Sequence, residues 1–118
     1  MENLKSKLII IYGKAGSYKS TISKLFLNEH NSCYMDIENN KYTLEDIINN
    51  LNNNNIVVVD YMELIGINID DIVKLKDIVS NTNKTLVIVS CCANNKDLFN
   101  KHYYILKEIA DLMILTDK

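Results

Sequence analysis

The chain has 118 residues, a net charge of −2 and thirteen basic residues, every one of which is a lysine. This length suits one domain with its own core, and we expect a single domain over residues 1–118. The small net charge excludes a chain-wide attraction to nucleic acid or anionic lipid. No apolar stretch approaches the roughly 20 residues of a membrane-spanning helix, so no membrane partner is expected. Three cysteines without a secretory signal favour a reducing, cytoplasmic location.

Short apolar runs predict five strands, at Leu8–Tyr12, Cys33–Ile37, Ile56–Val59, Thr85–Val89 and Leu112–Leu115. Helical periodicity predicts the segments between them, at Ser20–Asn28, Leu44–Leu51, Asp70–Val79 and Asp97–Ile109. Thr43 has the pattern of an N-cap, with Asp46 three residues later. Because strands alternate with helices, the sequence predicts an α/β fold with a mostly parallel, five-stranded sheet.

The segment between the first strand and the first helix has the pattern of a phosphate-binding loop. The consensus is glycine, four residues and then Gly-Lys-Ser/Thr. Here Tyr18 replaces the second glycine, while Gly16 supplies flexibility two residues earlier. Backbone N–H groups of such a loop, with the positive end of the following helix, face phosphate oxygens. ATP is therefore the predicted ligand, bound by Gly13, Lys14, Ala15, Gly16, Ser17, Tyr18, Lys19, Ser20 and Thr21.

Individual side chains of this loop have different predicted roles. Lys19 reaches the β- and γ-phosphates and is a predicted catalytic residue, and the Ser20 hydroxyl is a predicted Mg²⁺ ligand. Tyr18 is either an ordinary variant, with its ring against solvent or a neighbouring subunit, or a residue that stacks on the base. The first interpretation is favoured because side chains at that point usually lead away from the phosphates.

Ile56–Asp60 consists of four apolar residues closed by an acid, which is typical of a Walker B strand. Asp60 is the second predicted Mg²⁺ ligand, at the carboxyl end of the sheet. A carboxylate must also orient the water that attacks the γ-phosphate. Glu38 is the predicted base, because its strand would lie beside the Asp60 strand. Glu63 lies beyond the end of its strand and is the alternative, and Asp36 is a further candidate because it shares the strand end with Glu38.

Several segments resemble those of DnaB-type replicative helicases. Asp60–Ile65 resembles their Asp-Tyr-Leu-Gln-Leu segment, and Met35–Glu38 resembles the segment that carries the catalytic glutamate. Leu86–Ser90 resembles the strand that ends in a Ser-Gln phosphate sensor, and Lys107–Leu115 resembles the stretch leading into the last core strand. The match to RecA-like ATPases in general is closer than the match to DnaB itself. It implies a three-layer αβα P-loop NTPase fold with strand order 5-1-4-3-2, in which the strand ending at Ser90 separates those of Gly13 and Asp60.

The resemblance implies an Mg²⁺-dependent ATPase in DNA replication or recombination. Its expected partners are further copies of the chain, single-stranded DNA, or a replication or recombination protein. Two departures favour slow hydrolysis: Cys91 stands at the position of the sensor glutamine, and the chain has no arginine to serve as an arginine finger. The alternative is therefore a nucleotide-dependent binding or accessory module with slow or no hydrolysis. A small-molecule kinase ranks third, because such kinases usually surround the transferred group with arginines.

Overall fold

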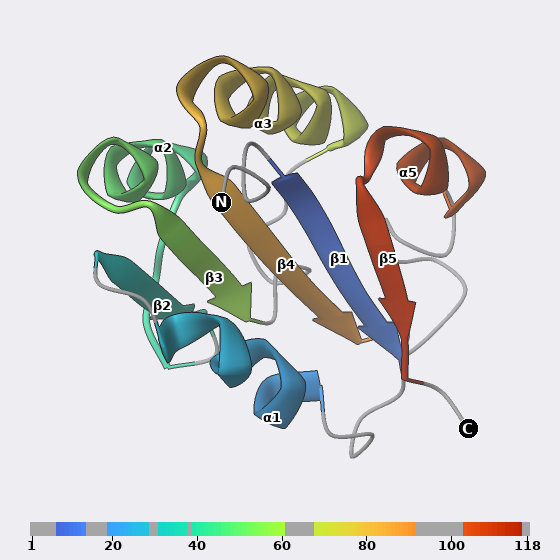
Figure 1. Cartoon of the computed structure of the whole chain (residues 1–118), viewed down its shortest axis with the longest axis horizontal. Helices are drawn as coiled ribbons and strands as arrows, with labels where there is room; N and C mark the ends of the chain where they lie inside the picture. Colours follow the sequence, from blue (N-terminus) through green and yellow to red (C-terminus); the bar gives the residue numbers. More distant parts are fainter. Residues whose placement is uncertain are drawn as a thin grey trace.

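The structure is a computed structural model that describes residues 7–13, 19–28, 31–37, 39–60, 68–91 and 103–116. Six of these are described by their backbone alone: Lys19, Ser20, Asn28, Cys91, Tyr103 and Leu115. The described residues form one sheet with helices on both faces (Figure 1).

The sheet has five strands: β1 (Lys7–Gly13), β2 (Ser32–Asp36), β3 (Ile56–Asp60), β4 (Thr85–Cys91) and β5 (Leu112–Leu115). Their order is β2-β3-β4-β1-β5, and every described pairing is parallel. Read from the other edge, this is the predicted order 5-1-4-3-2. The prediction that the strand of Ser90 separates the strands of Gly13 and Asp60 is confirmed, because β4 lies between β1 and β3.

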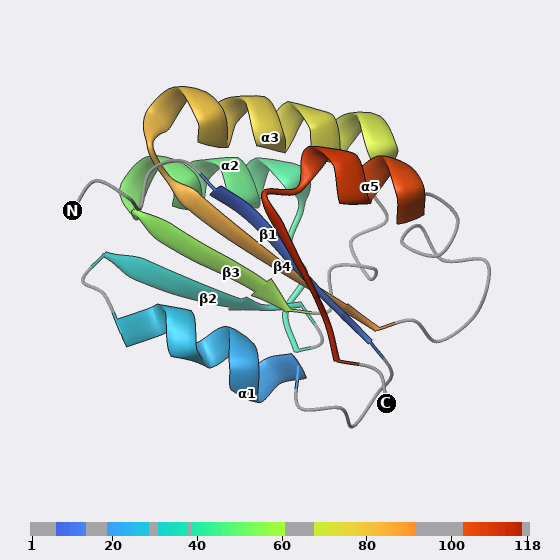
Figure 2. The same ribbon diagram turned by 45° about the vertical axis from the view of Figure 1, so that its right-hand side comes forward.

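Helices cover the two faces of the sheet unequally. One face carries α1 (Lys19–Lys24) and the 3-10 helix η2 (Leu25–Asn28), and the other carries α2 (Leu44–Asn53), α3 (Ile69–Thr82) and α5 (Tyr103–Ile109) (Figures 1 and 2). This arrangement confirms the predicted three-layer αβα architecture. No described helix has both the length and the apolar character that crossing a membrane requires.

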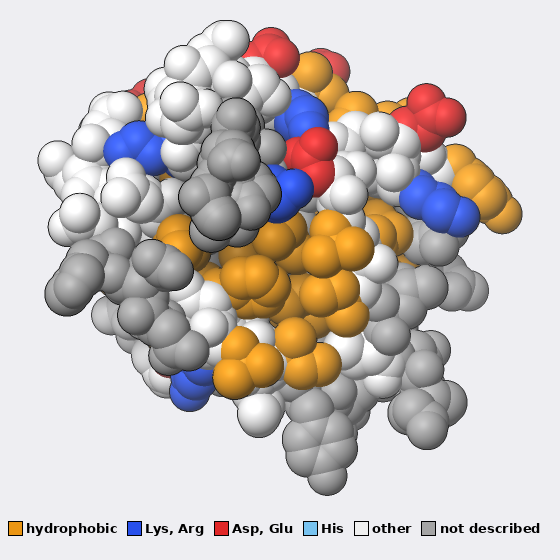
Figure 3. Space-filling view, in the orientation of Figure 1, with side chains coloured by type: hydrophobic (Ala, Val, Ile, Leu, Met, Phe, Trp, Pro, Cys, Tyr) orange, Lys and Arg blue, Asp and Glu red, His pale blue; other side chains and the backbone are white. Residues whose placement is uncertain are grey.

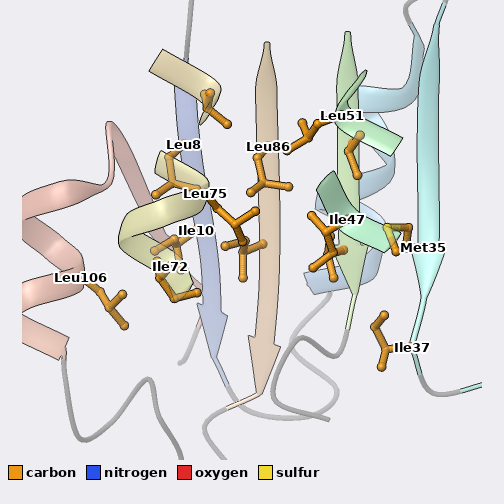
Figure 4. Packing of buried hydrophobic residues seen from close by; sticks show 14 of the residues in the cluster. Leu8, Ile10, Met35, Ile37, Ile47, Leu51, Ile72, Leu75, Leu86 and Leu106 are labelled. Carbon is orange, nitrogen blue, oxygen red and sulfur yellow. The ribbon is translucent and has the colours of Figure 1, made fainter. Parts of the chain in front are cut away.

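The strands are apolar throughout because both faces of the sheet are buried. Side chains alternate between the faces. The larger core lies under α2, α3 and α5 and includes Leu8, Ile10, Val59, Leu86 and Ile88 (Figure 4). The smaller core lies under α1 and η2 and contains Ile9, Ile11, Val58, Val87 and Val89. The alternation therefore assigns each strand residue to one side of the sheet.

The α1 side of the sheet is partly open at β5, which lies at the edge beyond β1. Ile114 packs on the smaller core, and Leu112, two residues earlier on the same side, is 47% exposed. Figure 3 shows hydrophobic side chains over the middle of the sheet in the view of Figure 1. The α1-side residues of β1 and β4, namely Ile9, Ile11, Val87 and Val89, are at most 3% exposed, so the opening lies at the β5 edge.

Several predicted boundaries differ from the structure. The helix predicted at Ser20–Asn28 is α-helical only to Lys24, and its last turn tightens into a 3-10 helix, as is common at helix ends. The second strand begins and ends one residue earlier than predicted. Of the helix predicted at Asp97–Ile109, residues 97–102 lie outside the described residues, and the rest is helical from Tyr103.

The amino edge of the sheet is joined by hydrogen bonds to Asp111. The Leu8 N–H donates to Asp111 Oδ2 at 2.7 Å, and Lys76 Nζ of α3 donates to the same oxygen at 2.8 Å. Burial by itself raises the pKa of the Asp111 carboxyl. The hydrogen bonds from Lys76 and Leu8, together with the charges of Lys76 and Lys7, outweigh burial and lower that pKa below its ordinary value.

Candidate functional site at the carboxyl edge of the sheet

The two ends of the predicted phosphate loop lie at the carboxyl edge of the sheet. β1 ends at Gly13, which is buried and pairs with Cys91 of β4. The backbone of Lys19 and Ser20 forms the first turn of α1, and Thr21 is exposed on that helix. Residues 14–18 lie outside the described residues, as do the side chains of Lys19 and Ser20. The strand before the loop and the helix after it, which the consensus requires, are both present.

Asp60 is the last residue of β3, and only 2% of its surface is exposed. It lies two residues after Val58, so its side chain is on the α1 side of the sheet. The Tyr34 hydroxyl of β2 donates a hydrogen bond to Asp60 Oδ2. The predicted Mg²⁺ ligand is thus a buried carboxylate, on the side of the sheet that carries α1, the helix after the predicted phosphate loop.

Tyr34 joins this edge to α1. Lys24 Nζ lies over the Tyr34 ring, 5.2 Å from its centroid, in the geometry of a cation–π contact. Sequence reasoning missed Tyr34, although the necessary signal was present in the strand pairing. In the register Tyr34 is opposite Val58, and Asp60 follows two residues later on the same face. A tyrosine at that diagonal position can reach the acid.

Asp36 lies directly opposite Asp60 in the pairing of β2 with β3. Its carboxylate accepts a hydrogen bond from Asn39 Nδ2 at 2.6 Å, and its carbonyl accepts one from Asn40 Nδ2 at 3.1 Å. The next residue, Ile37, donates its N–H to the Asp60 carbonyl at 3.2 Å. The structure therefore brings Asp36 to the edge with Asp60. Glu38 and Glu63, the other candidate bases, lie outside the described residues.

The predicted sensor strand ends with Ser90 on the other side of the sheet. Ser90 follows Leu86 and Ile88, which belong to the core under α3, so its side chain points away from the α1 side. Its hydroxyl is buried and has no hydrogen-bond partner in the described part of the chain. Ser90 and Asp60 thus lie on opposite faces at the same edge. Cys91 stands at the predicted position of the sensor glutamine, and its backbone pairs with that of Gly13 in β1.

Two carboxylates of the described residues, Asp36 and Asp60, lie next to each other at this edge. Within the described ranges, no three His, Cys, Asp or Glu side chains form a group that could enclose a metal ion. Mg²⁺ is usually bound by one or two carboxylates together with substrate phosphates and water. Asp60 provides such a carboxylate, and Asp36 beside it adds negative charge that a cation would offset. Asp60 thus has the chemistry of a carboxylate ligand to Mg²⁺, while the side chain of Ser20, the other predicted ligand, lies outside the described residues.

Comparisons with known proteins agree with the strand order. No model of a protein family matches the sequence, and no curated protein matches it. Among solved structures, the flagellar accessory protein FlaH from Methanocaldococcus jannaschii has a similar fold, with a TM-score of 0.68 and 15% sequence identity. The alignment covers 94% of this chain and 71% of that chain.

The sheet order and this similarity together establish a RecA-like α/β fold. At 15% identity, the similarity shows the fold and does not transfer an activity. The implied relation to DnaB-type helicases and to DNA replication receives no support from these comparisons.

Proposed function

We propose that this chain is a nucleotide-binding module that binds ATP with Mg²⁺ and serves as an accessory to another protein, with slow or no hydrolysis. Residues Gly13–Thr21 bind the phosphates, with Lys19 as the main cationic contact. Ser20 and Asp60 hold the metal. When bound, Mg²⁺ supplies positive charge that offsets the charge of the phosphates.

One observation carries this proposal: a buried carboxylate at the end of β3 on the side of α1. Asp60 is 2% exposed, and it lies at the edge where β1 ends and α1 begins. Ligands of open α/β folds bind at this carboxyl edge. The Tyr34 hydroxyl is one partner of this buried carboxylate, and a metal ion bound with phosphates would stabilise its charge further.

Two points favour an accessory role over rapid turnover. The chain has no arginine, and lysine lacks the bidentate fork with which an arginine finger stabilises the transferring phosphoryl group. The solved structure of similar fold is described as a flagellar accessory protein. That description supports an accessory role in general.

The second candidate is an oligomeric ATPase acting in DNA replication or recombination. It rests on the short segments around Met35–Glu38 and Asp60–Ile65 that resemble DnaB-type helicases. Turnover that single-stranded DNA stimulates several-fold would favour this candidate over the accessory module. A kinase is the least supported candidate. Direct pairing of the strands of Gly13 and Asp60 would have favoured it, and β4 lies between them.

The test is nucleotide binding by a Lys19→Ala variant. Removing the cation should weaken ATP binding by more than about tenfold, or roughly 1.4 kcal/mol. Titration with a fluorescent ATP analogue in Mg²⁺ measures the affinity, and circular dichroism checks the fold. Lys74→Ala is the matched control, because Lys74 is an exposed lysine on α3. If a folded Lys19→Ala protein binds ATP as tightly as the parent, the proposal is wrong.

A further inference from the structure

We propose that Tyr34 is a positioning residue that holds the Asp60 carboxylate in the orientation required for Mg²⁺. This inference rests on the proposed function and adds a residue that the phosphate-loop and Walker B patterns do not contain. The observation behind it is the hydrogen bond from the Tyr34 hydroxyl to Asp60 Oδ2.

The geometry follows from the pairing of β2 with β3. Tyr34 and Asp60 lie on the α1 side of the sheet, in a diagonal relation across the two strands. The long phenol side chain spans this diagonal, so that its O–H meets the acid at the carboxyl edge. Because Tyr34 is half-buried and packs on the smaller core, its ring is restrained. A restrained ring gives the hydroxyl a fixed direction.

The hydrogen bond leaves Asp60 able to bind a cation. An ionised carboxylate has about four lone-pair positions on its two oxygens. A phenol that donates to Oδ2 restricts rotation of the carboxylate. Ligating carboxylates are commonly held by such neighbours, and loss of the neighbour typically lowers metal affinity about 10- to 100-fold.

Lys24 links this arrangement to the helix that follows the phosphate loop. Its ammonium lies 5.2 Å from the centroid of the Tyr34 ring. A cation over the ring draws electron density from the phenol and makes its O–H a better donor. The contact also ties α1 to β2 through one side chain. The orientation of Asp60 thus depends on residues from α1, β2 and β3.

The experiment measures the Mg²⁺ dependence of nucleotide binding by Tyr34→Phe. This variant keeps the ring and its contact with Lys24, and removes only the hydroxyl. The affinity for a fluorescent ATP analogue is measured in EDTA and then across a Mg²⁺ titration. We expect the Mg²⁺ concentration at the midpoint to rise about tenfold or more, while the affinity in EDTA stays within about twofold of the parent.

Three variants accompany Tyr34→Phe. Tyr42→Phe is the matched control, because Tyr42 packs on the core of the opposite face and should keep the parental midpoint. Asp60→Asn should remove most of the Mg²⁺ enhancement. Lys24→Gln leaves the strands unchanged and should raise the midpoint in the same direction by a smaller factor. It therefore serves as the test if Tyr34→Phe does not fold.

The outcomes separate this inference from the proposed function. If the parent protein binds no nucleotide, the proposed function fails and the inference fails with it. If the parent binds ATP and Asp60→Asn removes the Mg²⁺ enhancement while Tyr34→Phe keeps the parental midpoint, only the inference is overturned. A lower midpoint in Tyr34→Phe would also overturn it, because the hydroxyl would then compete with the metal. An equal loss of affinity in EDTA would show a purely structural role.

Discussion

The carboxylates at the carboxyl edge differ in what surrounds them. Asp60 is buried and receives the Tyr34 hydroxyl, whereas Asp36 opposite it is partly exposed and receives an amide from Asn39. A group that orients a water molecule needs access to that water and to the γ-phosphate. Asp36 therefore remains a candidate base beside Glu38 and Glu63.

Substitution of the candidate bases should separate binding from hydrolysis. Glu38→Gln keeps the side-chain shape and removes the charge, so ATP affinity should stay within a few-fold while turnover falls about 10²-fold or more. Glu63→Gln and Asp36→Asn are matched controls and should reduce turnover much less. Phosphate release under single-turnover conditions measures the rates. Without an arginine, we expect the parental rate to lie below about one per second.

Two results would change this assignment. If Glu63→Gln or Asp36→Asn abolishes turnover and Glu38→Gln does not, the base has been wrongly assigned. If the parent shows no turnover alone, with single-stranded DNA or in its assembled state, the chain is a binding module without hydrolysis.

The position of Asp60 could be predicted from the sequence, because four apolar residues closed by an acid mark the end of a buried strand. Its role as a metal ligand stays a prediction. Tyr34 was missed because its contact with Asp60 depends on the register between the two strands, which the sequence analysis did not derive although it placed the strands side by side. The side on which Ser90 lies also depends on the register of β4, and the structure places it away from Asp60.

Among the secondary-structure elements, α2 and α3 both begin with a capping box. Thr43 accepts a hydrogen bond from the Asp46 N–H and Asp46 Oδ2 accepts one from the Thr43 N–H, and Asn68 and Asp71 repeat this reciprocal pair. Each pair satisfies two N–H groups that would otherwise lack intrahelical partners. The capping box at Thr43 was predictable because its signal is local.

Thr43→Ala should destabilise the protein by about 1 kcal/mol, because α2 loses its N-cap acceptor. Urea unfolding followed by circular dichroism measures the change. Thr82→Ala is the matched control: Thr82 is an exposed threonine whose hydroxyl donates to the Ile78 carbonyl near the end of α3. Its effect should stay within about 0.5 kcal/mol. Equal losses in the two variants would contradict a specific role for the cap.

Asp111→Asn should lower stability at pH 7 by about 1 kcal/mol. The value lies at the low end for a charged hydrogen bond, because a third of the Asp111 side chain is exposed. Folding lowers the pKa of this carboxyl, so its contribution is complete above the unfolded-state pKa of about 3.9 and is lost as pH falls through the folded-state value. Parent and variant should therefore become similarly stable as the pH falls below about 4.

Unfolding free energies measured from pH 7 to pH 3 check this expectation. Lys76→Gln is the companion variant. It removes the ion pair and leaves the Leu8 hydrogen bond to Asp111, so its effect should be smaller than that of Asp111→Asn. A difference between parent and Asp111→Asn that stays constant down to pH 3 would contradict the role of the charge.

The predicted strands were largely correct, because short apolar runs that alternate with helical segments are typical of parallel strands buried on both faces. Helix ends were less predictable. The periodicity of Ile22, Leu25 and Phe26 does not reveal that the helix tightens after Lys24. Strand order could not be derived from periodicity alone, since it depends on long-range pairing, and it was obtained only through the RecA-like resemblance.

For the whole molecule, the position of β1 has a consequence during synthesis. This strand precedes the predicted phosphate loop, and its two neighbours in the sheet are the last two strands that the structure describes, β4 and β5. Because synthesis starts at the amino end, the apolar run Leu8–Tyr12 has no neighbouring strand until β4, which begins at Thr85, has left the ribosome. Such exposed strands are prone to aggregation. Because β1 lacks both of its sheet neighbours until β4 and β5 have been made, the predicted nucleotide site at its carboxyl end can assemble only after Leu112–Leu115 has been synthesised.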